Sequence, residues 1–302
     1  MNYRTIGNSD LVVSEIGLGC MSLGTEKSKA QSIIDRSLDF GINYFDTADL
    51  YDTGVNEEII GSAIKHRRND VILATKVGNR FEPGKEGWSW DPSKEYIKNA
   101  VKHSLRRLGT DYIDLYQLHG GTIEDPIDET IEAFEELKQE GIIRYYGISS
   151  IRPNVIREYI KKSSIISVMM QYSILDQRPA EEIINLLSEN NISMIARGPL
   201  AKGLLTDKWR KKISTNGYLH LSNQELTQSL EHMQQALGKR PLQEYALRYC
   251  LYQDAIASVM PGASSIQQVE DNVTSALSTP LTKEEVNIIN DLIRADQYQQ
   301  HR

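Results

Sequence analysis

The chain has 302 residues, of which 40% are hydrophobic and 25% charged, a composition typical of a globular protein with a large core. Its net charge of −7 argues against nucleic acid as the main partner, because a phosphate backbone requires a basic face. No run approaches the roughly 18 apolar residues of a membrane span, and two cysteines, Cys20 and Cys250, are too few for a disulfide framework. We therefore expect a cytoplasmic enzyme or binding protein, a monomer or small homo-oligomer, with neither nucleic acid nor membrane as partner.

Short apolar runs alternate with helical patterns along the chain. The runs predicted as strands are Ser14–Leu18, Ile42–Phe45, Val71–Thr75, Tyr112–Leu118, Arg144–Ile148, Ile165–Met170, Ile192–Ala196 and Ala255–Met260. Amphipathic spacing predicts helices at Ala30–Phe40, Ile97–Leu108, Glu129–Glu140, Pro153–Lys161, Ala180–Glu189 and Ile266–Leu277. Eight strands that alternate with helices predict an α/β protein with a single domain over residues 1–302, whose parallel sheet closes into a (β/α)8 TIM barrel.

The two ends of the chain and one internal segment lie outside this alternation. Tyr3–Val13 precedes the first strand, and we expect it to form an N-terminal hairpin that caps the barrel floor. Thr282 begins a capping box that predicts a C-terminal helix through about Arg294. Lys202–Ser222 is the least regular stretch and is a candidate lid. The tail Ala295–Arg302 is short and polar, so we do not expect it to reach over a pocket.

Chemically active side chains follow three of the predicted strands. Asp46 and Tyr51 follow the second strand, Lys76 the third and His119 the fourth. In a closed barrel these strand ends open on one face, where active sites form. A phenol is a weak acid whose pKa of about 10 is lowered by a nearby cation such as Lys76. Asp46 keeps that lysine charged, and His119 hydrogen-bonds the substrate oxygen or relays a proton. The four side chains therefore predict that Tyr51 delivers a proton to a carbonyl oxygen.

The segments around these residues resemble the aldo-keto reductase superfamily, in matching order from about Tyr3 to Asn272. The matching segments are Asp46–Tyr51, Gly54–Glu57, Thr75–Gly78 and Ile113–His119. The resemblance implies a bacterial-type, NADP-linked barrel enzyme that binds its dinucleotide without a Rossmann fold. It implies that NADPH, rather than NAD, supplies hydride for reducing aldehydes or ketones to alcohols, and that the catalytic tetrad falls on Asp46, Tyr51, Lys76 and His119. Because residue 119 is His and not Glu, carbon–carbon double-bond reduction is not implied.

The dinucleotide site is not marked by the common glycine fingerprint, since no Gly-x-Gly-x-x-Gly segment follows a strand. A turn at Gly262 instead opens a helix with capping-box spacing at Ser265 and Gln268, and its N-terminus is either an anion site or simply a well-capped helix. The resemblance favours the anion site and implies further binding residues. These are Gly19, Cys20 and Met21 at the nicotinamide ribose, Ser149 and Gln171 at the carboxamide, Gly198, Pro199, Leu200 and Lys208 at the pyrophosphate, and Gly262, Ser264, Gln268, Asp271 and Asn272 at the adenosine phosphate.

Two features depart from the family pattern. Arg197 stands where many members place an aromatic ring that stacks on the nicotinamide. A guanidinium can also stack flat against the cofactor, or it can form a salt bridge at the barrel mouth. The segment 262–272 holds no Lys or Arg, so a 2′-phosphate would rely on Ser264, Ser265 and the helix dipole, or on a cation from Arg210, Lys211 or Lys212.

Trp88 and Trp90 lie in a loop after the third predicted strand. The resemblance implies an aromatic wall for apolar or aromatic carbonyl substrates, with Trp88 as the candidate residue, whereas the alternative is that the pair pins the loop to the barrel.

Two other functions compete with carbonyl reduction. A redox-sensing subunit would bind the dinucleotide with slow turnover, and a metal-dependent hydrolase would need several ligands at strand ends. Among six histidines only His119 is so placed, so we expect no metal site.

Overall fold

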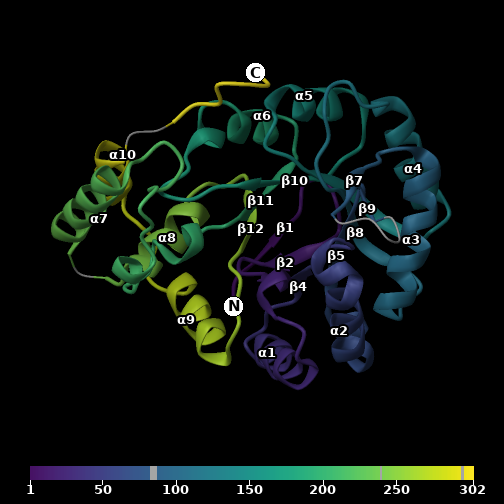
Figure 1. Ribbon diagram of the computed structural model, residues 1–302, viewed down its shortest axis with the longest axis horizontal. Helices are drawn as coiled ribbons and strands as arrows, with labels where there is room; N and C mark the ends of the chain where they lie inside the picture. The colour runs from purple at the N-terminus through teal and green to yellow at the C-terminus, as the bar shows by residue number, and fades with distance from the viewer. Residues whose placement is uncertain (82–86, 239, 294–295) are drawn as a thin grey trace.

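The computed structural model describes residues 1–81, 87–238, 240–293 and 296–302. Eight parallel strands form one sheet at its centre (Figure 1). In chain order they are β3 (Leu18–Gly19), β4 (Tyr44–Asp46), β5 (Ile72–Val77), β8 (Ile113–Leu118), β9 (Ile143–Ser149), β10 (Ser167–Gln171), β11 (Ser193–Arg197) and β12 (Ile256–Met260). Parallel bridges from Ile16 to Val259 and from Gly19 to Gly262 join the two edges of the sheet, so the strands close into the predicted (β/α)8 TIM barrel.

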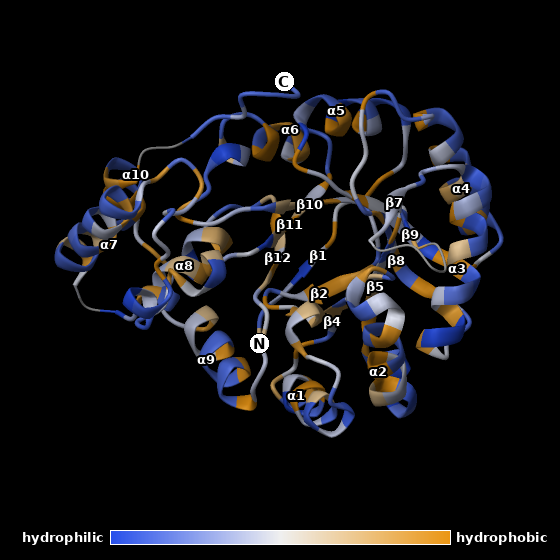
Figure 2. Cartoon of the chain, in the orientation of Figure 1, coloured by the Kyte–Doolittle hydropathy of each residue, from blue (hydrophilic) through white to orange (hydrophobic). Residues whose placement is uncertain are grey.

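Helices surround the barrel, as Figure 1 shows. They are α1 (Lys27–Asp39), α2 (Val55–Ile64), α3 (Lys94–Leu108), α4 (Ile127–Gln139), α5 (Pro153–Lys162), α6 (Ile183–Glu189), α7 (Asn223–Leu237), α8 (Leu242–Leu251), α9 (Ile266–Ala276) and α10 (Lys283–Leu292). Hydrophobic residues gather on the strands and on the helix sides that face them, and hydrophilic residues cover the outer helix surfaces (Figure 2). In α3, for example, Ile97, Val101 and Leu108 are buried at helical spacing. No described helix is long and apolar enough to cross a membrane.

The structure adds three helices, α2, α7 and α8, that the sequence prediction lacks. The signal for α7 was present, because Ser222 and Glu225 form a complete capping box ahead of a buried stripe that includes Leu226 and Leu230. The first barrel strand is also shorter than predicted, since Ser14 belongs to an earlier strand. The capping box predicted at Thr282 is confirmed, and the helix it opens ends at Leu292. Residue 294, where that helix was expected to end, lies outside the described residues.

The N-terminal hairpin closes one end of the barrel, as predicted. It consists of the antiparallel strands β1 (Tyr3–Thr5) and β2 (Val12–Ser14). Ile6, Leu11 and Val13 are buried and belong to the same apolar cluster as Ile166 near the start of β10. Because the hairpin fills the end at which the strands begin, only the end at which they finish remains open to a ligand.

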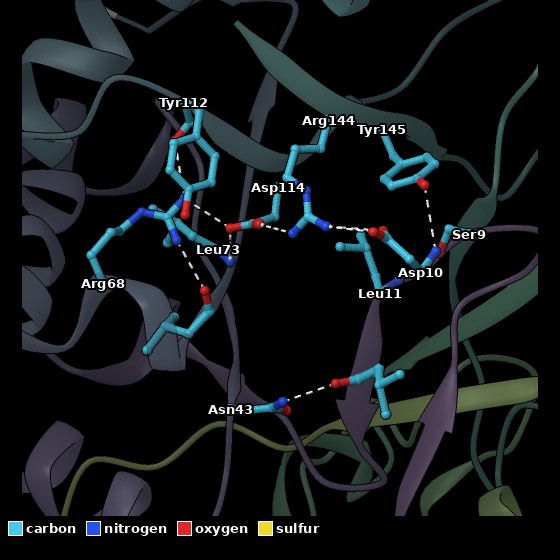
Figure 3. Close-up of polar contacts among 12 residues, drawn as sticks. Ser9, Asp10, Leu11, Asn43, Arg68, Leu73, Tyr112, Asp114, Arg144 and Tyr145 are labelled. Atoms are coloured by element: carbon cyan, nitrogen blue, oxygen red, sulfur yellow. Dashed lines mark hydrogen bonds and ion pairs between the residues drawn. The ribbon is translucent and has the colours of Figure 1, made fainter. Parts of the chain in front are cut away.

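Polar contacts fasten this hairpin to the barrel, and Figure 3 draws them. The buried carboxylate of Asp114 accepts from Arg68 and Arg144, each at 2.8 Å, and from the backbone N–H of Leu73 at 3.0 Å. The guanidinium of Arg144 also reaches Asp10 of the hairpin at 2.9 Å. The barrel floor is thus tied by ion pairs that lie away from the open end.

Candidate active site

Asp46, Tyr51 and Lys76 meet inside the open end of the barrel, because β4 and β5 are neighbouring strands. Lys76 Nζ donates to Asp46 Oδ2 at 2.5 Å, to the carbonyl oxygen of Thr47 at 2.7 Å and to Tyr51 Oη at 3.2 Å. An ammonium has three N–H donors, so all three are used and the side chain has one orientation. The second carboxylate oxygen of Asp46 accepts from Gln117 Nε2 at 3.1 Å. The phenol of Tyr51 therefore lies against a fixed cation.

The charge of Lys76 is set by two opposing effects. Its side chain is buried, and burial alone would lower the pKa of Lys76, but its interactions with Asp46 and Tyr51 together outweigh this and hold that pKa above its ordinary value. Lys76 is therefore protonated throughout the neutral range. A charged lysine next to a phenol stabilises the phenolate that proton donation leaves behind.

His119 completes the group from the end of β8. Its ring lies edge-on to the ring of Tyr51, with centroids 6.0 Å apart and planes at 84°. Burial, followed by the positive charges of Lys76 and Arg197, lowers the pKa of His119 to about 3. Among the described residues, no hydrogen-bond partner reaches its buried Nδ1 atom. His119 is thus a neutral imidazole that can hydrogen-bond a substrate oxygen.

A cavity of about 1610 Å³ opens above these side chains, larger than the roughly 300–1,000 Å³ of ordinary small-ligand sites. The four predicted catalytic residues and all of the predicted cofactor-binding residues line it. The latter are Gly19, Cys20, Met21, Ser149, Gln171, Arg197, Gly198, Pro199, Leu200, Lys208, Gly262, Ser264, Gln268, Asp271 and Asn272. A Cβ atom on Gly262 would lie 2.4 Å from Ser22 Oγ, so the backbone forms this part of the wall. A long cavity with a bare backbone wall and many polar lining groups fits a dinucleotide.

Arg197 ends β11 and lies on the cavity wall. Its Nη1 donates to Gln171 Oε1 at 3.3 Å, and Gln171 Nε2 in turn donates to Asp176 at 2.9 Å and to Tyr218 Oη at 3.3 Å. Within the described ranges no carboxylate forms an ion pair with Arg197. Of the two roles predicted for this residue, the salt bridge at the barrel mouth is therefore not seen. The guanidinium is held by an amide, and its charge acts on Asp46 only from beyond ion-pair distance.

The far end of the cavity is formed by the start of α9. Ser265 caps the helix by accepting from the backbone N–H of Gln268. The reciprocal half of the predicted capping box is absent, because Gln268 Oε1 accepts instead from the backbone N–H of Ser264 at 2.7 Å. Other cavity-lining cations stand outside the 262–272 segment. Among them are Lys202, Lys208 and Lys212, none of which is ion-paired with a described acid.

The C-terminal tail was expected to stay clear of the pocket, and this prediction is wrong. Residues 296–301 line the cavity, and the chain ends beside α5 and α6 (Figure 1). The carbonyl oxygen of His301 accepts from the backbone N–H of Asn154 at 2.9 Å. The ring of Tyr298 is buried under the guanidinium of Arg178, 4.9 Å from its centroid. A buried aromatic ring, a backbone hydrogen bond and the pairs Asp296–His220 and Arg302–Glu181 hold this polar segment in place.

The structure does not bring Trp88 to the cavity. Its side chain is 54% exposed, and it is not among the described residues that line the cavity. Trp90 lies in a short strand, β7 (Ser89–Trp90), which pairs with β6 (Asn79–Arg80), and Trp88 directly precedes that strand. The indole N–H of Trp90 donates to Asp125 at 3.0 Å, and its ring packs against Gly78. Trp90 therefore anchors the loop to the barrel, which was the alternative to an aromatic substrate wall.

Several cavity residues were not found from the sequence. Arg152, Arg178 and Tyr218 line the cavity, and Tyr218 comes from the segment predicted as a lid. Their positions depend on loops that fold back over the barrel mouth, which no local pattern in the sequence encodes. In the part of the chain that the structure describes, no cluster of three or more His, Cys, Asp or Glu side chains could hold a metal ion.

A barrel of this kind, with a lysine, a tyrosine, an aspartate and a histidine at its open end, defines a class of oxidoreductases that use a nicotinamide cofactor. The sequence model of the Aldo/keto reductase family matches residues 15–294, so the chain belongs to that family. A Bacillus subtilis (strain 168) protein described as an uncharacterized oxidoreductase YqkF is 60% identical over the full length of both chains.

Two further relatives are informative. The holo-form structure of aldo-keto reductase AKR11C1 from Bacillus halodurans superimposes on this chain with a TM-score of 0.96 and 62% sequence identity. The match covers 100% of this chain and 99% of the Bacillus halodurans chain. The NADH-specific methylglyoxal reductase of Escherichia coli (strain K12) is 30% identical, and the match covers 98% of this chain and 99% of the Escherichia coli protein. The chain is therefore an NAD(P)H-dependent aldo/keto reductase.

Proposed function

We propose that this enzyme reduces aldehydes or ketones to alcohols, with Tyr51 as the proton donor and NADPH as the preferred cofactor. The observation that carries the proposal is the contact of Tyr51 Oη with the buried ammonium of Lys76, at 3.2 Å. When bound, the cofactor supplies the hydride that adds to the carbonyl carbon. The remaining chemistry belongs to the protein side chains.

The side chains act on the carbonyl oxygen. Tyr51 donates its proton to that oxygen, and Lys76 stabilises the resulting phenolate. Asp46 holds Lys76 in place through its 2.5 Å contact, and neutral His119 orients the oxygen by a hydrogen bond. The buried position of Lys76 keeps water from screening its charge, which strengthens its effect on the phenol.

Replacement of the phenol tests the proton donor. We expect Tyr51→Phe to lower kcat for aldehyde reduction by about 10²- to 10⁴-fold, the usual contribution of a positioned general acid, with cofactor binding preserved. Tyr145→Phe makes the same chemical change at the barrel floor, where Tyr145 Oη contacts the backbone of Asp10 (Figure 3), and should leave kcat unchanged. Full activity in Tyr51→Phe would overturn the proposed mechanism.

The preference for NADPH is supported by Lys202, Lys208 and Lys212, whose charges are not paired with described acids at the cavity wall. The Escherichia coli relative is named as NADH-specific, so the affinities of this enzyme for NADPH and NADH should be compared directly. Fluorescence quenching should give tighter binding of NADPH than of NADH. Lys208→Gln should weaken NADPH binding about five- to tenfold and NADH binding little, whereas Lys138→Gln on α4 should affect neither. Equal affinities of the wild-type protein would contradict the preference.

A redox-sensing subunit with slow turnover is the competing function. The contacts among Asp46, Tyr51 and Lys76 favour catalysis, because a sensor has no need of a phenol held against a cation. We place the enzyme in the cytoplasm, where free thiols such as those of Cys20 and Cys250 persist. Tight cofactor retention with negligible turnover over a panel of carbonyl compounds would favour the sensor instead.

A further inference from the structure

The backbone that follows Tyr51 is strained. Tyr51 begins a single turn, η2 (Tyr51–Gly54), in which three consecutive residues have left-handed backbone angles: φ is 48° at Asp52, 55° at Thr53 and 89° at Gly54. Positive φ is uncommon outside glycine and is an outlier for a β-branched residue such as Thr53. The strain lies at Asp52 and Thr53, because glycine adopts positive φ freely, and a strained residue persists only where its surroundings enforce it. Something outside the turn must therefore hold it.

The side chain of Arg107, from α3, lies directly against the turn. A Cβ atom on Gly54 would come within 2.7 Å of Arg107 Cδ, so the aliphatic part of the arginine occupies the space that a side chain would take. Arg107 is 26% exposed, and its guanidinium turns inward to Glu57, which is fully buried. Arg107 Nε donates to Glu57 Oε2 at 2.6 Å. The arginine is thus anchored at one end while it packs on the turn.

The same carboxylate reaches the strand of the catalytic lysine. Thr75 Oγ1 donates to Glu57 Oε1 at 2.6 Å, and Thr75 directly precedes Lys76 in β5. A continuous series of contacts therefore runs from β5 through Glu57 and Arg107 to the turn that carries Tyr51. The series ends at the strand that carries Lys76 and at the turn that carries Tyr51. The proposed proton transfer depends on the distance between these two side chains, which is 3.2 Å from Lys76 Nζ to Tyr51 Oη.

A second acid, Asp49, lies near the ion pair of Glu57 and Arg107. Asp49 is buried, and burial, followed by the charge of Glu57, raises the pKa of Asp49 to about 8. At neutral pH Asp49 is consequently mostly protonated, so it adds little negative charge beside Arg107. A single ion pair inside the protein gives little net stability, because both ions lose their hydration. Its value is therefore better sought in positioning than in stability.

We propose that Arg107, anchored by Glu57, is a positioning residue for Tyr51: it braces the left-handed turn so that the phenol stays against Lys76. This inference rests on the proposed function, in which Tyr51 is the proton donor. It predicts that loss of the brace changes the rate of the chemical step and has little effect on cofactor binding, because Arg107 does not line the cavity.

The chain contains a matched control for this ion pair. Arg68 and Asp114 form a similar buried pair at 2.8 Å on the barrel floor, at the other end of the strands (Figure 3). Arg68→Met and Arg107→Met each remove a guanidinium from a buried carboxylate, so both should lower the urea midpoint of unfolding. Only Arg107→Met should lower kcat, about ten- to a hundredfold, with KM and NADPH affinity within about threefold of wild type. An unchanged kcat in folded Arg107→Met would overturn the proposal.

Two further variants keep the test decisive. If Arg107→Met does not fold, the double variant Glu57→Gln, Arg107→Met removes both charges and leaves no unpaired ion, and its kcat should fall similarly. Combination with Tyr51→Phe shows whether Arg107 acts through the phenol. In that background Arg107→Met should not lower the residual rate further, and a further fall by the same factor would overturn the positioning role. An active Tyr51→Phe variant would instead refute the proposed function itself, so the two failures are distinguishable.

Discussion

His119 lies beside two cations, Lys76 and Arg197, and its pKa falls from 6.5 to about 3 because burial and both charges disfavour protonation. Between these two pH values the unfolded chain binds a proton at this position that the folded chain does not. The free energy of unfolding therefore falls as pH drops from about 6.5 toward 3, by up to about 1.4 kcal/mol per pH unit from this group alone.

Replacement by an uncharged side chain removes this dependence. We expect the stability of His119→Gln to decline less steeply than that of wild type between pH 6.5 and pH 4, and the two curves to run parallel above pH 7. Urea unfolding at intervals of half a pH unit measures both slopes. Equal slopes in acid would show that His119 titrates in the fold as it does in the unfolded chain. Because the imidazole stays neutral, the kcat profile should also lack an inflection near pH 6.5 from this residue.

Not every residue of the site was equally accessible to sequence reasoning. Asp46, Lys76 and His119 could be placed because each follows an apolar run, and barrel topology brings strand ends together. Arg107 and Glu57 are 50 residues apart and meet only because α2 packs on α3. Arg107 falls on the polar side of an amphipathic helix, so the sequence gave no sign of its contact with Glu57. The inner part of the site was thus predictable from periodicity, and its support was not.

At the scale of elements, the alternation of strands and helices was predicted because each has its own hydrophobic period. The helices that were missed are α2, which follows β4, and α7 and α8, which lie between β11 and β12. Helix α8 is apolar on most sides, with Leu242, Tyr245, Leu247 and Leu251 all buried, so it lacks the stripe that marks a surface helix. The C-terminal tail was misjudged because its anchors, the buried ring of Tyr298 and ion pairs to distant residues, leave no pattern in an otherwise polar segment.

That tail offers a test at the same scale. Tyr298 is 6% exposed, whereas Tyr252, which serves as its control, is 42% exposed. We expect Tyr298→Ala to lower the free energy of unfolding by about 2–4 kcal/mol, since it leaves a cavity beneath Arg178, and Tyr252→Ala to lower it by less than about 1 kcal/mol. Limited proteolysis should also cut the tail of Tyr298→Ala faster. Equal stability losses in the two variants would show that the tail is not held by this ring.

For the whole molecule, the two ends of the barrel have separate tasks. The end where the strands finish carries the cavity and the strained turn after Tyr51, and the other end is sealed by the hairpin and its ion pairs. The closed barrel was predictable from eight repeats. The ion pairs at the floor were not, because Asp10, Asp114 and Arg144 come from three distant parts of the sequence and meet only after closure.

This division predicts that the floor affects stability and not activity. Asp114 is 2% exposed and accepts from both Arg68 and Arg144, so Asp114→Ala leaves two guanidiniums without their buried partner and should cost about 3–5 kcal/mol of unfolding free energy. Asp10 is 68% exposed, and its pair with Arg144 is open to solvent, so Asp10→Ala should cost about 1 kcal/mol or less. Urea unfolding gives both values, and kcat per folded molecule should stay at the wild-type level in each variant. A fall in kcat for folded Asp114→Ala would mean that the floor communicates with the catalytic end, because no contact of Asp114 reaches the cavity.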